Sequence, residues 1–145
     1  MIYLLLLARI FLGSVFVYSG WGKLLAPVEN FQATIGGYQL IPQVLIIPIA
    51  LIAPWCEFIF GSFLVLGFMI RISASVLMIF LVTFVILLSR SLLLHLPISE
   101  CGCFGSGIIL APWQALALDS GLLILSLVVL KKNARLLSLD RRLTR

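Results

Sequence analysis

Residues 72–94 read ISASVLMIFLVTFVILLSRSLLL, an apolar run with one charged side chain, Arg90. A bilayer core about 30 Å thick is crossed by roughly 20 apolar residues in an α-helix, so this run predicts a membrane span. Three further apolar runs, at about residues 2–22, 41–68 and 112–130, predict spans as well. A helix satisfies its own backbone hydrogen bonds in lipid. The sequence therefore predicts an all-α membrane protein, a bundle of four transmembrane helices.

The composition of the whole chain agrees with this fold class. Of the 145 residues, 63% are hydrophobic and 10% are charged, and the mean hydropathy is +1.26. Soluble domains contain about 25% charged residues, which excludes an ordinary soluble domain. Arg9 lies inside the first apolar run and no basic cluster precedes that run. We therefore expect a retained first span, not a cleaved signal peptide, and a single domain over residues 1–145.

The basic residues predict an orientation. Six of the ten lysines and arginines lie in the tail of residues 131–145, and Arg71 lies in the short connection between the second and third spans. Because positive residues favour the cytoplasmic side, both termini and the tail are predicted to be cytoplasmic. The connections of residues 23–40 and 95–111 would then face the periplasm or its equivalent, outside the inner membrane. A basic tail beside a span is explained by topology and does not indicate nucleic-acid binding.

The connection before the last span contains the sequence CGCFG at residues 101–105. Disulfides persist outside the cytoplasm. Cys101 and Cys103 could close only a small, strained ring, which the glycine between them makes possible. Strained or exposed disulfides are labile, so the pair predicts thiol–disulfide exchange. A static disulfide that pins the loop, and a metal site that uses His95 and Glu100 as further ligands, stay open as alternatives.

Three ionisable residues lie within the predicted spans: Arg9, Glu57 and Asp119. A charge in the bilayer costs several kcal/mol unless it is paired, so we expect Arg9 and Glu57 to form an ion pair. This pair could be a structural pin or part of a polar pocket or proton path. Asp119 lies roughly 10 Å below the start of the last span and could accept protons that dithiol oxidation releases. Its candidate partners are the basic residues near the outer boundary: Lys23, Arg90 and His95. Equally, desolvation could keep Asp119 protonated without a partner.

Two neighbours of Glu57 complete the set of candidate residues. Cys56 is expected to be a small buried apolar residue, with a third redox thiol as the alternative. Trp55, Glu57 and Asp119 could border a pocket for a membrane quinone, by analogy with other four-helix membrane enzymes that form disulfides. The sequence contains no flavin or haem motif, and a membrane quinone is the candidate cofactor.

Several of these residues together resemble one family, the MauE branch of the DoxX-like membrane proteins. They are Arg9, Ser19, Gly20, Lys23, Tyr38, Glu57, Gly61, the CGCFG of residues 101–105, Trp113 and Asp119. The resemblance covers nearly the whole chain, and the CGCFG loop is its distinguishing part. It implies a four-helix membrane bundle that acts, beside a thioredoxin-like partner, in the maturation of a disulfide-rich periplasmic dehydrogenase subunit.

The same resemblance bears on individual residues. Cys101 and Cys103 match the family's loop thiols, and Arg9, Glu57 and Asp119 match its intramembrane polar positions. We therefore expect a membrane thiol–disulfide oxidoreductase, or a redox relay, that exchanges disulfides with a thioredoxin-fold protein or a small thiol. Two other functions stay open. One is a non-enzymatic assembly or anchoring factor for a redox protein; the other is a small transporter or metal-handling protein.

Overall fold

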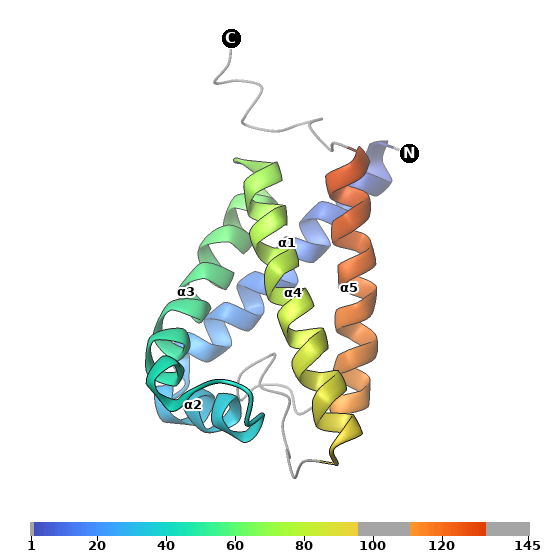
Figure 1. Cartoon of the computed structure of the whole chain (residues 1–145). Helices are drawn as coiled ribbons and strands as arrows, with labels where there is room; N and C mark the ends of the chain where they lie inside the picture. Colours follow the sequence, from blue (N-terminus) through green and yellow to red (C-terminus); the bar gives the residue numbers. More distant parts are fainter. Residues whose placement is uncertain (1, 96–110, 133–145) are drawn as a thin grey trace.

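The computed structural model describes residues 2–95 and 111–132, which form five α-helices. They are α1 (Ile2–Leu25), α2 (Val28–Gly37), α3 (Gln43–Leu66), α4 (Ile70–Leu93) and α5 (Pro112–Lys132). The helices α1, α3, α4 and α5 are long and apolar enough to cross a membrane, which confirms the four predicted spans. They form an up-and-down bundle, and the short helix α2 lies at one end of it (Figure 1).

The helix α2 corrects one expectation. Residues 23–40 were expected to be a loop, but α1 continues to Leu25 and α2 follows after a short turn. Phe31 and Ile35 lie one helical turn apart on α2, and both are buried with Ala50 and Ala53 in one apolar cluster. A helix of 10 residues is too short to span, so hydropathy over the length of a bilayer does not detect it.

The two ends of the bundle differ in what they carry. The helix α1 begins and α5 ends at the same end, as four antiparallel spans require (Figure 1). The opposite end carries α2, the last turn of α4 and the first turn of α5. Cys101 and Cys103 lie outside the described residues, in the segment that joins α4 to α5. Which end faces the cytoplasm stays a prediction.

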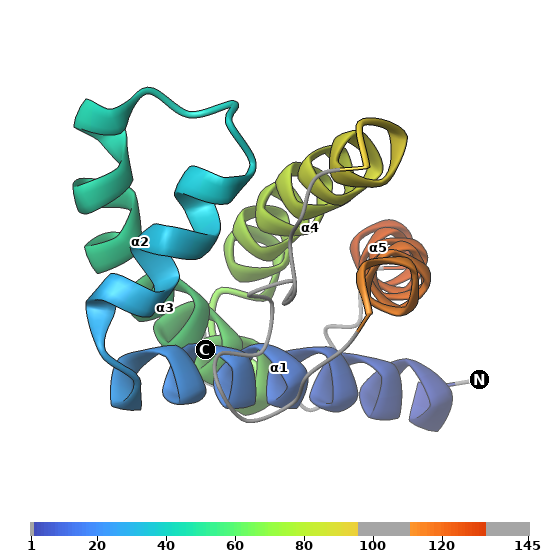
Figure 2. The same ribbon diagram turned by 90° about the horizontal axis from the view of Figure 1, so that it is seen from below.

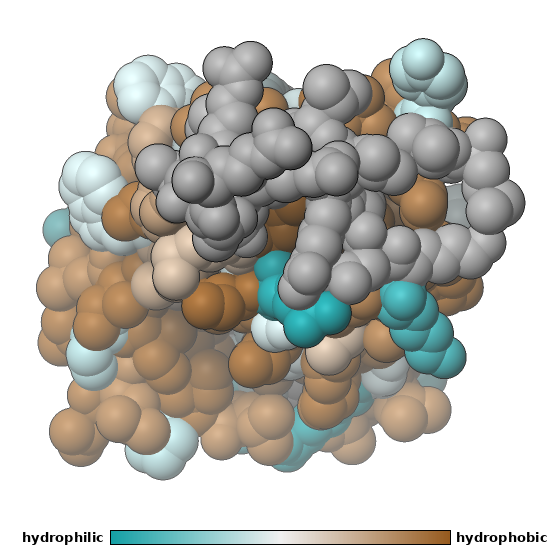
Figure 3. Space-filling model, turned by 90° about the horizontal axis from the view of Figure 1, so that it is seen from above, coloured by the Kyte–Doolittle hydropathy of each residue, from teal (hydrophilic) through white to brown (hydrophobic). Residues whose placement is uncertain are grey.

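The four spans associate as two pairs. The helix α1 packs most extensively against α3, and α4 packs most extensively against α5. Viewed from the end that carries α2, the α4–α5 pair lies on one side of the crossing of α1 and α3 and contacts it through α1 and α3 (Figure 2). The central apolar core joins the pairs through buried leucines, among them Leu12, Leu64 and Leu77. Large apolar side chains are exposed on all four spans, as contact with lipid requires. Apolar residues also make up much of the described surface seen from the end where α1 begins and α5 ends (Figure 3).

Glycines set the distance between α1 and α3. A Cβ atom on Gly20 would lie 2.7 Å from the backbone nitrogen of Phe58 and 2.8 Å from the carbonyl oxygen of Pro54. A Cβ atom on Gly13 would lie 2.8 Å from the carbonyl oxygen of Gly61. Small residues let transmembrane helices approach this closely, and the contact is made by backbone that cannot move aside. The crossing of α1 and α3 therefore depends on these glycines.

We predict that Gly20→Ala lowers the free energy of unfolding by about 1–3 kcal/mol, because the added methyl group overpacks a backbone contact. Thermal unfolding in detergent measures this change. Gly121→Ala is the matched control, since a Cβ atom there meets nothing within 4 Å. Equal stability of the two variants would contradict the close approach of α1 and α3.

Candidate functional site

A buried ion pair joins α1 to α3 within the membrane. The Nζ atom of Lys23 donates hydrogen bonds to both carboxylate oxygens of Glu57, each at 2.8 Å. The hydroxyl of Ser19 donates to Oε2 of the same carboxylate at 2.9 Å. The side chains of Lys23 and Glu57 are 1% and 0% exposed. Charge-assisted bonds of this length are strong, and the low dielectric of the interior strengthens them further.

Two aromatic rings enclose the ammonium group of this pair. The Nζ atom of Lys23 lies 5.0 Å from the ring centroid of Phe31 on α2 and 4.9 Å from that of Phe84 on α4. A cation this close to an aromatic ring is attracted by the ring's quadrupole, more so where water is excluded. The lysine therefore connects four helices: α1, which carries it, and α2, α3 and α4, which contact it.

Asp119 places α5 next to the same carboxylate, that of Glu57. Its side chain is buried and lines a cavity of about 20 Å³ together with Ser19, Glu57 and Phe84. A cavity of this size holds about one water molecule when polar groups line it. The structure thus brings Glu57 and Asp119, two of the predicted residues, to one small polar space. This space can hold a water molecule and a proton but is too small for a quinone ring.

The expected pair of Arg9 with Glu57 is replaced by the pair of Lys23 with Glu57. The glycine contacts fix the register of α1 against α3. Gly20 lies against Pro54 and Phe58. Gly13, two turns earlier on α1, lies against Gly61 and Val65, which are two turns later on α3. In this antiparallel register Ser19 is level with Glu57. Arg9 precedes Ser19 by ten residues, which places it about 15 Å away along the helix axis. Arg9 is itself buried in the bundle.

Lys23 was missed as the partner of Glu57 because the first apolar run was expected to end at residue 22. In the structure α1 extends to Leu25, and Lys23 is buried inside the bundle. A signal for this was present in the sequence. Ser19 and Lys23 are four residues apart, so on a continuing helix they share one face and can reach the same carboxylate.

A sequence model of the family described as "Methylamine utilisation protein MauE" matches residues 1–132. The chain belongs to the MauE family. The match includes all five helices and every residue of the buried polar cluster formed by Ser19, Lys23, Glu57 and Asp119. Neither a curated protein nor a solved structure matches the chain. Family and fold together make it a multi-pass membrane protein of a family associated with methylamine utilisation.

The remaining predicted residues of this MauE family member lie apart from the polar cluster. Trp55 is 56% exposed on the outer face of α3 and is not among the residues that line the cavity of Glu57 and Asp119. Cys56, expected to be buried, is half-buried and has a free thiol. His95 follows α4 with a φ of 48° and is exposed, at the end of the bundle that carries α2.

We predict strong coupling between Lys23 and Glu57. Lys23→Met lowers the free energy of unfolding by about 3–5 kcal/mol, because it leaves a carboxylate buried without its cation. Adding Glu57→Gln recovers part of this loss, and a double-mutant cycle of unfolding free energies in detergent measures the difference. Arg71→Met, which removes an exposed cation at the start of α4, provides the control, and its effect adds to that of Glu57→Gln within about 0.5 kcal/mol. Absence of coupling between Lys23 and Glu57 would refute the register.

Proposed function

We propose that this MauE family member is a membrane thiol–disulfide oxidoreductase, or a redox relay, whose Cys101 and Cys103 cycle between dithiol and disulfide. The supporting observation is that α4 ends and α5 begins at the same end of the bundle. The segment that contains both cysteines follows α4 and precedes α5 at the end of the bundle that carries α2 (Figure 1). Thiols joined to this end of a membrane bundle could meet a partner in the aqueous phase and stay close to the buried polar cluster.

The exchange that we propose takes place in two successive thiolate attacks. A thiolate of the partner attacks one sulfur of the Cys101–Cys103 disulfide; a mixed disulfide forms and the ring S–S bond breaks. A second partner thiolate then attacks the mixed disulfide and leaves the partner oxidised. Two electrons and two protons have then passed to Cys101 and Cys103. The partner would be a thioredoxin-fold protein or a small thiol on the periplasmic side of the inner membrane.

Reoxidation of the dithiol releases two protons, and the buried polar cluster supplies an acceptor. Asp119 lies seven residues into α5, the helix that follows the cysteine segment directly. Its side chain shares with Glu57 a cavity that holds about one water molecule. A water molecule between two carboxyl groups can pass a proton from one to the other. We assign Asp119 the role of proton acceptor on this basis.

Cys103→Ser is expected to accumulate a covalent mixed disulfide, formed when the Cys101 thiolate attacks the disulfide of the oxidised partner, because Cys103 is the thiol that would displace the partner in the reverse of the exchange step. Non-reducing electrophoresis of membranes, followed by mass spectrometry of the adduct, detects this species. Cys56→Ser is the matched control and leaves exchange unchanged. If neither Cys103→Ser nor Cys101→Ser forms an adduct and both variants are less abundant in the membrane, the cysteines only lock a loop. The anchoring function then replaces the relay.

Asp119→Asn is expected to slow reoxidation of the dithiol by about 10²-fold, the lower range for loss of a positioned proton acceptor. Raising the pH restores part of the rate, because solvent base then removes the thiol protons. Stopped-flow alkylation of the remaining thiols at a series of pH values follows the reaction. A uniform slowing at all pH values would point to a structural role of Asp119 and refute proton transfer.

A further inference from the structure

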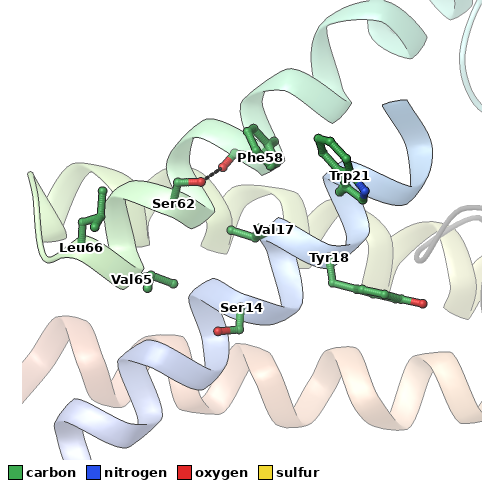
Figure 4. A pocket seen from close by; sticks show the side chains of 8 residues that line it. All are labelled: Ser14, Val17, Tyr18, Trp21, Phe58, Ser62, Val65 and Leu66. Carbon is green, nitrogen blue, oxygen red and sulfur yellow. Dashed lines mark hydrogen bonds between the residues drawn. The ribbon is translucent and has the colours of Figure 1, made fainter. Parts of the chain in front are cut away.

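A groove of about 570 Å³ opens between α1 and α3 on the outer face of the bundle (Figure 4). Each helix contributes four side chains to its lining, which is mainly aliphatic and aromatic. Ligand pockets commonly measure about 300–1,000 Å³, so the groove is large enough for a ligand, unlike the cavity beside Glu57. Both helices that form it are membrane spans, so the groove is reached from the hydrocarbon of the bilayer.

The groove and the buried polar cluster lie back to back. Tyr18 and Phe58 line the groove, whereas their chain neighbours Ser19 and Glu57 face the interior and are hydrogen-bonded to each other. Successive residues of a helix point in directions about 100° apart, so one crossing of α1 and α3 presents both sites. A molecule in the groove is therefore at the depth of the polar cluster, with one layer of helices between them.

Two serine hydroxyls lie on opposite walls of the groove, which Tyr18 also lines. The hydroxyl of Ser62 on α3 donates to the carbonyl oxygen of Phe58 at 2.7 Å, the usual arrangement for serine in a membrane helix (Figure 4). The hydroxyl of Ser14 on α1 is exposed in the groove and has no hydrogen bond within residues 2–95 and 111–132. A hydroxyl that faces hydrocarbon without a partner is costly. Ser14 therefore points to a ligand that brings an oxygen atom.

The depth of Ser14 limits what that ligand can be. It lies twelve residues from the start of α1 and eleven from its end, which is near the middle of a hydrocarbon core about 30 Å thick. The ester and phosphate groups of a phospholipid lie at the interface, too far out to meet this hydroxyl. The oxygen must belong to a molecule that is soluble in the hydrocarbon itself, such as a ring that bears carbonyl groups.

We propose that the groove binds a prenylquinone, with a ring carbonyl accepting a hydrogen bond from Ser14. The prenyl chain would lie along the aliphatic part of the groove, between Val17 on one wall and Val65 and Leu66 on the other. The redox role of the ligand rests on the proposed function. A quinone held there would supply an acceptor for the two electrons and two protons that the Cys101–Cys103 dithiol loses when it becomes a disulfide.

Binding is tested with the full chain in phospholipid nanodiscs, by titration with decylubiquinone. Trp21 lines the groove, so its fluorescence reports occupancy once Trp55 and Trp113 are replaced by phenylalanine. We expect quenching that saturates at one equivalent. Ser14→Ala weakens binding about fivefold through the lost hydrogen bond. Ser14→Phe fills the groove and abolishes saturable quenching.

Thr83→Phe is the matched control, an exposed hydroxyl residue of α4 that is replaced by the same ring and does not line the groove. It is expected to bind decylubiquinone as the parent protein does. Quenching that rises linearly and equally in all variants would show partition into lipid alone and overturn the proposal. Displacement of decylubiquinone by phosphatidylcholine with brominated chains would assign the groove to lipid and overturn it as well. Replacing Cys101 and Cys103 by serine leaves binding intact, so a failure of the thiol chemistry can be told apart from a failure of the groove.

Discussion

The buried pair of Lys23 and Glu57 is the constraint on which the rest of the bundle depends. Apolar contacts between helices in lipid have no hydrophobic driving force and tolerate small shifts along the helix axis. An ion pair does not, because a shift of α1 by one residue moves Lys23 by 1.5 Å and turns it by about 100°. Either change would leave a charge in the membrane without its partner. The pair therefore specifies the depth and the rotation of α1 relative to α3.

The glycine contacts and the ion pair act on the same helix crossing but have different roles. Gly13, Gly20 and Gly61 let the two backbones touch, which supplies close packing along the crossing. Lys23 then draws Phe31 of α2 and Phe84 of α4 around its ammonium group, so the remaining helices are positioned relative to the crossing. The short helix α2 is thereby fixed over the end of the bundle even though it is too short to cross the membrane.

Those features that depend on local sequence could be predicted, and those that depend on register could not. The four spans follow from the length and hydropathy of each run taken alone. The partner of Glu57 depends on how far α1 slides along α3, which glycine contacts between distant residues decide, and so Arg9 was chosen over Lys23. Glu57, Asp119 and Trp55 were expected at one pocket, but Trp55 lies exposed on α3 and outside the cavity of Glu57 and Asp119. Hydropathy gives the depth of a residue and not the face that it occupies. The helix α2 lies below the length at which hydropathy is informative.

The arrangement of the two sites gives the crossing of α1 and α3 a further consequence. Oxidation of a dithiol in a membrane must send electrons and protons to acceptors, and these need different surroundings. Protons require buried polar groups and water, which the cavity of Glu57 and Asp119 can provide. A hydrophobic electron acceptor requires an apolar groove that is open to lipid, which the outer face of the same helices provides. A charged cluster on the lipid-facing side would be too costly, and a ligand site for a lipid-soluble molecule inside the bundle would be hard to reach. Placing the two sites on opposite faces of one helix pair satisfies both requirements within a chain of 145 residues.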